Sequence, residues 1–408
     1  MSPPVTVAVC GAGAPWEAAL VRGLQRRELG IEVSRRCVDR AELLGVALRD
    51  RPAAVLLRAE LPWLDRDLVG TLHDAGVAVV AVEREAGSRP LERIGVTHRV
   101  TADATADEVA ALLWSLDEPT PPLPAGGDAT RSQDPAGGPA PGPPAPAGVL
   151  TAVWGGPGAP GRTSVAVHLA VEEARRGRRC ILVEGDTWAP CLAQLLGLPD
   201  GPGLAQAARL ASDGWPRPLA SVLHDGPHGV QVLAGLPRAE LWPELRERAW
   251  RAILDEARDE ADVVVVDVAA PIEEDEELSF DRVPFRRNLA TRVALAEATG
   301  IVMVVAGHPV GIRHGVLARQ QLERDLPLAA SRASTVVNRS PRGARRLQDC
   351  STELARFTGA APVAFLPVEP AFERVIWEGR ILHEVAARSA WLRELRGLVD
   401  RIEPAVAA

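Results

Sequence analysis

The stretch from Trp154 to Ser164, WGGPGAPGRTS, matches the pattern of a phosphate-binding loop at every fixed position but one. The pattern is G-x-x-x-x-G-K-[ST], and Gly156, Gly161 and Thr163 fill its other fixed positions. Arg162 stands where the lysine is expected. These residues indicate a loop that binds a phosphorylated ligand, with an arginine in place of the usual lysine.

The sequence on either side of the loop predicts the elements that such a loop requires. Residues 149–154 predict a strand, and residues 163–176 predict a helix that ends at Gly177. Glycines such as Gly158 let backbone N–H groups turn toward phosphate oxygens, and the N-terminus of the helix adds partial positive charge. We expect Thr163 to ligate Mg²⁺ and Ser164 to contact a phosphate.

The rest of the chain after the loop continues in alternating strands and helices. Buried strands are predicted at 180–186, 261–271, 301–307 and 333–340, and a further strand and turn at 361–380. This succession predicts an α/β domain with a parallel sheet over residues 149–408.

A second α/β domain is predicted before the loop, over residues 1–117. Strands are predicted at 5–11, 53–59 and 77–83, with helices at 16–28, 67–76 and 107–116. Between the two domains, 22 of the 31 residues in 118–148 are Pro, Gly or Ala, so we expect a disordered or polyproline-like linker there. The stretch GAGAPW (11–16) is half of a dinucleotide fingerprint, but its third glycine is missing.

Composition excludes several classes of function. The net charge of −8 gives no basic surface for wrapping nucleic acid, so DNA binding is not expected. The five cysteines lack C-x-x-C spacing, which favours free thiols in a reducing compartment. No apolar run approaches the ~20 residues of a membrane helix. We expect a soluble, cytoplasmic protein.

The motifs and their order resemble those of the MinD/ParA branch of P-loop ATPases, specifically at 155–186, 262–271 and 336–370. The overall arrangement is most similar to the CpaE/TadZ proteins, which join an atypical receiver to a MinD-like ATPase and position the Tad/Flp pilus machinery at the cell pole. The resemblance implies ATP and Mg²⁺ as cofactors. It also implies a homodimer and partners in pilus assembly or secretion, with peripheral rather than integral association with the membrane.

The resemblance also implies roles for individual residues. Asp267 matches the Asp that closes the second hydrophobic strand and supports the water shell of the magnesium ion. Asp186 matches the Asp that helps to place the attacking water, and Glu184 is a further acidic residue at that strand end. Asn338 matches the asparagine that reads the adenine edge, and Pro367 begins the second base-contacting turn.

The loop departs from the family pattern in its cations. MinD-like ATPases carry two lysines there, and both are lost, because Arg162 and Pro157 stand at their positions. All 46 basic residues of the chain are arginine, so a coding bias is one explanation for Arg162. The guanidinium is nevertheless larger and forked, and the exchange is not conservative. We expect nucleotide binding with slow or no hydrolysis.

The first domain resembles a response-regulator receiver over residues 4–116, without its chemistry. The stretch RAELP puts Arg58 where the phosphoacceptor Asp belongs, with Pro62 at the turn proline. The acidic pair at the end of the first strand is also replaced, by CGAGAP. We expect a pseudo-receiver that is not phosphorylated and serves interaction or dimerisation.

Two segments leave alternatives open. The acidic run Glu273 to Glu277 follows Asp267 and fits a solvated loop or a nucleotide-sensing switch. The helix predicted at 389–402 mixes charge signs, which favours packing against its own domain over membrane binding.

Three functions remain for the whole chain. The first is a nucleotide-regulated scaffold like CpaE/TadZ. The second is an active ParA/MinD-type ATPase of chromosome partitioning or septum placement. The third is an interaction protein that binds no nucleotide.

Overall fold

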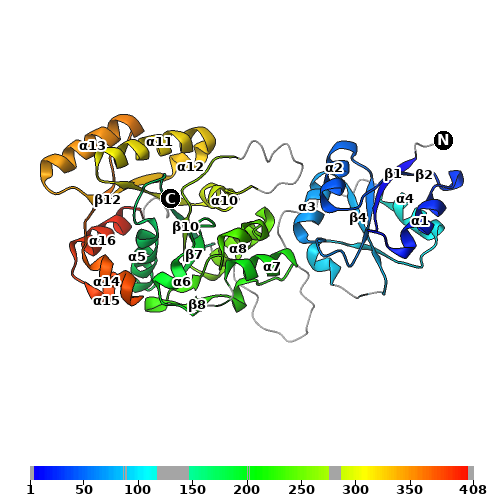
Figure 1. Cartoon of the computed structure of the whole chain (residues 1–408), viewed down its shortest axis with the longest axis horizontal. Helices are drawn as coiled ribbons and strands as arrows, with labels where there is room; N and C mark the ends of the chain where they lie inside the picture. The colour runs from blue at the N-terminus through cyan, green and yellow to red at the C-terminus, as the bar shows by residue number, and fades with distance from the viewer. Residues whose placement is uncertain are drawn as a thin grey trace, which may run out of the picture. The chain divides into compact units, whose positions relative to one another are not determined.

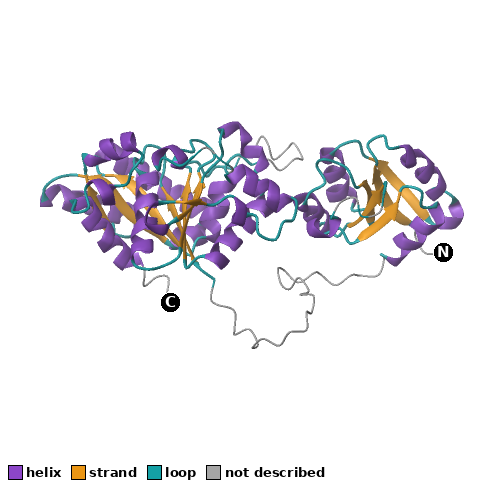
Figure 2. Cartoon of the chain, turned by 90° about the horizontal axis from the view of Figure 1, so that it is seen from below, coloured by secondary structure: helices purple, strands orange, loops and turns teal. Residues whose placement is uncertain are grey.

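The chain forms two compact units, Met1–Pro146 and Ala147–Ala408, in a computed structural model. The structure describes residues 4–85, 87, 90–116, 147–199, 201, 203–274 and 286–402. Residues 118–146 of the predicted linker (118–148) lie outside the described residues. Residues 275–277 of the acidic run Glu273 to Glu277 also lie outside them. None of the helices in the described ranges is long and apolar enough to cross a membrane. Figures 1 and 2 show each unit as a sheet between helices.

The first unit contains a five-stranded parallel sheet in the order β2-β1-β3-β4-β5. This is the flavodoxin-like order of doubly wound sheets. The strands are β1 (Val5–Cys10), β2 (Ile31–Arg36), β3 (Ala54–Arg58), β4 (Ala78–Glu83) and β5 (His98–Thr101). The helices are α1 (Pro15–Leu24), α2 (Arg40–Asp50), α3 (Arg66–Asp74) and α4 (Ala106–Ser115), with 3-10 turns η1 (Arg27–Leu29) and η2 (Leu91–Ile94).

The helices of the first unit bury one core on each face of the sheet. Helices α1 and α4 pack on one face, and α2 and α3 pack on the other. At the carboxyl end of β3, Arg58 forms an ion pair of 3.1 Å with Glu60. The assignment of this unit as a pseudo-receiver and its expected lack of phosphorylation stay predictions.

The second unit contains an eight-stranded sheet in the order β13-β12-β11-β6-β10-β7-β9-β8. All neighbours are parallel except β8 and β9. The strands are β6 (Val149–Trp154), β7 (Cys180–Gly185), β8 (His224–Asp225), β9 (Gln231–Leu233), β10 (Val263–Val268), β11 (Gly300–Ala306), β12 (Ala333–Ser340) and β13 (Ala364–Pro367).

Helices cover both faces of this sheet, as Figure 2 shows. One layer comprises α7 (Leu204–Ser212), α8 (Glu247–Glu260), α10 (Leu289–Glu297), α11 (Pro309–Asp325), α12 (Pro327–Ser331) and α13 (Ala344–Thr358). The other comprises α5 (Arg162–Arg175), α6 (Leu192–Leu195), α14 (Ala371–Glu378), α15 (Leu382–Val385) and α16 (Ala390–Ile402). Three 3-10 turns complete the unit: η3 (Leu219–Ser221), η4 (Pro227–Gly229) and η5 (Ala239–Glu244).

Strand order brings the chemically important residues together. Strand β6 lies between β11 and β10, and β7 follows β10. The phosphate-binding loop leaves β6 at its carboxyl end, the edge of an open parallel sheet where ligands bind. The strand ends that carry Asp267 and Glu184 are paired directly at this edge.

The C-terminal helix packs against its own unit, as its mixed charge predicted. In α16, Trp391, Leu395 and Leu398 are buried with at most 1% exposed surface. Their apolar face joins the core that α5 also buries. This helix therefore belongs to the fold of the second unit.

Candidate phosphate-binding site

The loop between β6 and α5 has a backbone that only glycine adopts easily at two positions. The φ angles of Gly158 and Gly161 are +78° and +80°. Gly161 is also the N-cap of α5, so the loop ends where the helix presents its first N–H groups. A Cβ atom on Gly156 would lie 2.6 Å from the Cβ of Ala318, so the loop lies close against α11. We call this tight turn of the backbone over Gly156 to Gly161 the glycine cradle, and the binding of phosphate by it stays a prediction.

Substituting Gly161 tests this cradle. A Cβ there would lie 2.4 Å from Nδ2 of Asn338, in addition to the strain of the positive φ. Gly177 is a matched control, because it has a φ of +86° at the far end of α5 and no atom within 4 Å of its Cβ position.

We expect G161A to lower the melting temperature more than G177A does. The backbone-strain cost of ~1 kcal/mol is common to both variants, so a difference in melting temperature reports on the contact with Asn338. We also expect only G161A to lose the change in tryptophan fluorescence on addition of ATP–Mg²⁺. Thermal melts and titrations of the two proteins check this. Equal effects would show that contact with Asn338 is unimportant.

Arg162 lies over the backbone of its own loop. Its Nη1 donates hydrogen bonds of 3.4 Å each to the carbonyl oxygens of Gly155 and Ala159. These bonds are long, and the side chain is half-buried. The guanidinium is therefore placed at the loop but is weakly held there.

Asp267 is the most unusual carboxyl group of the site. It has 2% exposed surface, and its Oδ1 has no hydrogen-bond partner among the described residues. Burial raises its pKa to about 7, an effect opposed by a hydrogen bond from Thr163 and reinforced by the charges of Glu184 and Asp186. A buried acceptor without a donor is costly unless a cation or a proton supplies the partner.

The two acidic residues at the end of β7 have different roles. Glu184 accepts backbone N–H bonds from Cys191, from Leu192 at 2.8 Å and from Gly235 at 2.7 Å, so it fixes the surrounding loops. Burial nevertheless raises its pKa, because desolvation outweighs those three bonds.

Asp186 fixes the turn that follows β7. Its Oδ1 accepts the N–H groups of Trp188 at 2.8 Å and Ala189 at 2.9 Å. Sequence reasoning gave Asp186 a role in placing water. That role stays a prediction, and the structure adds that one oxygen is used to hold the turn.

The donor set fits a magnesium ion. Thr163 and Asp267 offer a hydroxyl and a carboxylate oxygen, the hard donors that Mg²⁺ takes in small number while keeping its waters. The sulfur of Cys191 lies 4.0 Å from the Thr163 hydroxyl, but burial raises the pKa of this thiol to about 11. In the absence of a metal ion it is therefore a neutral thiol at pH 7.

Asn338 connects the loop to the C-terminal helix. Its Nδ2 donates to the carbonyl oxygen of Pro160 at 3.0 Å, and its Oδ1 accepts from Nε1 of Trp391 at 3.1 Å. Pro367 ends β13 beside Ser340, close in the sheet to Asn338. Base reading by Asn338 and Pro367 stays a prediction, and the support of the loop by Asn338 and Trp391 was missed.

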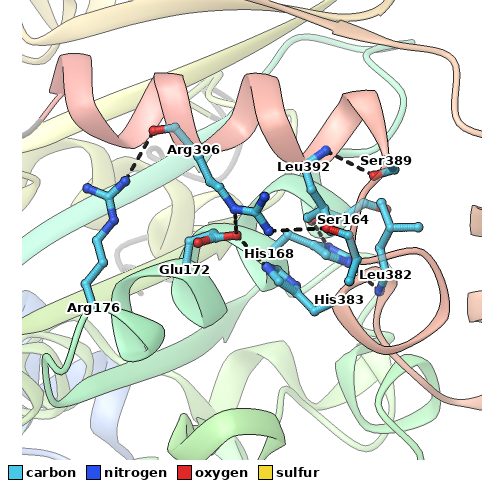
Figure 3. A network of polar contacts seen from close by, with 10 residues as sticks. Ser164, His168, Glu172, Arg176, Leu382, His383, Ser389, Leu392 and Arg396 are labelled. Atoms are coloured by element: carbon cyan, nitrogen blue, oxygen red, sulfur yellow. Dashed lines mark hydrogen bonds and ion pairs between the residues drawn. The ribbon is translucent and has the colours of Figure 1, made fainter.

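A second connection runs from α5 to the C-terminal elements (Figure 3). Nε2 of His168 accepts the N–H of Leu382 at 2.9 Å, so its Nδ1 carries the proton and donates to the carbonyl oxygen of Ser164 at 2.7 Å. Burial lowers the pKa of His168 to about 3, which keeps it neutral. Ser164, the predicted phosphate contact, is thus held through its backbone.

The same network continues one turn along α5, as Figure 3 shows. Glu172 accepts from Nε2 of His383 at 2.7 Å and from Nε of Arg396 at 2.8 Å. Burial raises the pKa of Glu172, but the hydrogen bond from His383 and the charge of Arg396 outweigh it, and the pKa lies below its ordinary value. Helix α5, which starts at the loop, is thereby tied to α15 and α16.

A cavity of about 830 Å³ lies elsewhere, between α11 and α13. Its apolar lining includes Ile312, Val316 and Phe357, and it contains no residue of the phosphate-binding loop. It is a separate feature of the surface.

No family model matches the chain. The antiactivator FleN of Pseudomonas aeruginosa is 26% identical over 260 residues, which cover 62% of this chain and 86% of that protein.

Two solved structures resemble the chain in fold. The cell division ATPase MinD of Pyrococcus furiosus matches with 20% identity and a TM-score of 0.50, over 63% of this chain and 99% of that one. A ParA family ATPase from Chlorobium tepidum matches with 17% identity and a TM-score of 0.52, over the same shares. The chain therefore contains the α/β fold of MinD/ParA P-loop ATPases.

Proposed function

We propose that the second unit binds ATP with Mg²⁺ and uses the bound nucleotide to regulate a homodimer rather than to drive rapid turnover. The observation that carries the proposal is the unpartnered buried Oδ1 of Asp267, beside the Thr163 hydroxyl and the glycine cradle. When bound, Mg²⁺ would neutralise charge on the phosphates. Thr163 and Asp267 would hold the ion, and loop N–H groups would orient the phosphates.

Slow or absent hydrolysis follows from the cations of the loop. Phosphoryl transfer depends on positioned charge, and the loss of one such contact typically costs ~10²–10³ in rate. Arg162 replaces the compact lysine, and Pro157 offers no charge at the second position. The residues of the loop support nucleotide binding more strongly than they support hydrolysis.

The first unit would be a pseudo-receiver that serves interaction. The whole chain would act as a CpaE/TadZ-like organiser of pilus assembly or secretion, cytoplasmic and placed at the pole or at the inner face of the membrane. This assignment rests on the resemblance in domain order and on the flavodoxin-like sheet that carries Arg58 at the phosphoacceptor position.

A working ATPase of the partitioning or septum-placing kind is the second candidate. The observation that favours it is the presence of Asp186, Asp267 and Thr163 together at one sheet edge. An interaction protein that binds no nucleotide is the third candidate.

Titration with ATP–Mg²⁺, followed by tryptophan fluorescence, tests the proposal. Trp188 is the reporter, because it is 47% exposed and follows Asp186 in the turn. Trp154 is buried and donates to the carbonyl oxygen of Ala270 at 3.0 Å, so it is a poorer reporter than its place beside the loop suggests.

We expect a saturable change that EDTA weakens, with turnover far below the ~10 s⁻¹ of a median enzyme. Partner-stimulated turnover near that rate would favour the second candidate instead. A flat trace, confirmed by calorimetry, would overturn nucleotide binding and leave the third.

A further inference from the structure

Arg287 is held against the turn that follows Asp186. Its Nη1 donates to the hydroxyl of Thr187 at 3.1 Å, and its Nη2 donates to the carbonyl oxygen of Thr187 at 3.0 Å. The guanidinium carbon lies 4.1 Å from the ring centre of Trp188 and 5.2 Å from that of Trp242. Two aromatic rings and two hydrogen bonds therefore fix the position of this cation.

Neighbouring contacts hold the same turn from the other side. Nε1 of Trp188 donates to Oδ1 of Asn288 at 3.0 Å, and Nδ2 of Asn288 donates to the carbonyl oxygen of Glu273 at 2.9 Å. Arg287 thus belongs to an ordered junction between the end of β7 and the start of α10.

Asp186 links this junction electrostatically to the phosphate-binding loop. Its charge acts on Arg287 and also on Asp267, which in turn is influenced by Arg162. Geometry places the junction at the same sheet edge, because Arg287 bonds to Thr187, three residues after Glu184, and Glu184 is paired with Asp267 across the sheet. Asp186 is the carboxylate that Arg287 and Asp267 share as a neighbour.

The loop itself is short of positive charge for a triphosphate. Arg162 is its one charged residue, and its Nη1 is directed at loop carbonyls. A fully ionised triphosphate chain carries about four negative charges, of which Mg²⁺ and a single cation offset about three, and ATP-binding sites supply further cations. The residue that supplies this charge must come from outside the loop.

We propose that Arg287 is the second phosphate cation of this site and that it distinguishes a nucleoside triphosphate from a diphosphate. The inference rests on the proposed function and deepens it. Each terminal nitrogen of a guanidinium carries two N–H groups, and one of each is used toward Thr187. The others remain for phosphate oxygens while the contacts with Thr187 and the rings are kept.

Calorimetric affinities for ATPγS–Mg²⁺ and ADP–Mg²⁺ test this in four full-length proteins. These are the wild type, R287A, R287Q and R292A. Gln at position 287 keeps a polar amide donor on a shorter side chain but is uncharged. Arg292 is the matched control, because it also braces the start of α10, with Nη1 donating to the carbonyl oxygen of Ile272 at 2.6 Å.

We expect R287A and R287Q to bind ATPγS about 10- to 100-fold more weakly, as for the loss of a charge-assisted hydrogen bond, and ADP within about 3-fold of the wild type. R292A should keep the wild-type ratio of the two affinities. Melting temperatures of all four confirm folding, and R287Q decides the question if R287A does not fold.

Other outcomes separate the two proposals. An equal loss of both affinities in R287Q would make Arg287 a brace of the turn and overturn its phosphate role. Unchanged affinities would overturn it as well. A wild type that binds neither nucleotide would overturn the proposed function itself.

Discussion

Replacing Asp267 with Asn should raise the melting temperature of the nucleotide-free protein at pH 8 and abolish the further rise that ATP–Mg²⁺ produces. Two opposite effects come from one carboxyl group. Without a cation, its buried charge is a cost that Asn does not carry. With a cation, the same charge is the ligand that Asn cannot replace as well.

The pKa of Asp267 determines how the stability of the nucleotide-free protein changes with pH. The pKa of Asp267 is about 7 in the folded protein, against ~4 for an unfolded chain. The folded state therefore binds the proton more tightly, and the resulting stability is complete below pH 4 and is lost as the pH rises through 7. The difference is on the order of 2–4 kcal/mol, which corresponds to roughly 4–16 °C of melting temperature for a unit of this size.

Melts of wild type and D267N at pH 5 and pH 8, with and without ATP–Mg²⁺, check both halves. The advantage of D267N in the absence of nucleotide should shrink at pH 5, where the wild-type carboxyl group is protonated. If D267N is less stable at both pH values, the carboxylate is already compensated in the nucleotide-free protein and Oδ1 is not an open ligand position.

Restoring lysine at the loop should separate binding from hydrolysis. We expect R162A to weaken ATP binding by about 10- to 100-fold, because a charge-assisted contact is removed. We expect R162K to keep the affinity and raise the hydrolysis rate by about 10-fold or more, because the ammonium is compact and the long bonds to Gly155 and Ala159 are given up easily.

Calorimetry and single-turnover hydrolysis measure these two quantities separately. R175K is the control, since Arg175 is an exposed residue near the other end of α5. A rate in R162K no higher than that of the wild type would show that Arg162 is not the limit on hydrolysis. The uncharged Pro157, or the turn that Asp186 holds, would then be the next cause to examine.

Much of the sheet could be predicted because its central strands are continuous apolar runs. Residues 261–271 predicted β10, which spans Val263–Val268, and residues 333–340 predicted β12 without error. The edge strand β2 was missed because only Ile31 of its six residues is buried. Its other residues are mostly polar, so the sequence contains no continuous apolar run there. Strands β8 and β9 are too short to have a period.

The site shows the same limit at the level of side chains. The loop glycines, Thr163 and Asp267 could be found because a local pattern names them. Sequence gives no such signal for contacts between distant segments. The partner of Asn338 is 53 residues away at Trp391, and that of His168 is 214 residues away at Leu382. Only the fold brings these pairs together.

The bond from Trp391 to Asn338 has a practical consequence for imaging this protein in cells. The first turn of α16 supports the carbonyl oxygen of Pro160 through Asn338, so a fluorescent protein attached close to α16 would act on this contact. A fusion that pulls on this helix would disturb the nucleotide loop. A label placed away from α16 avoids this disturbance.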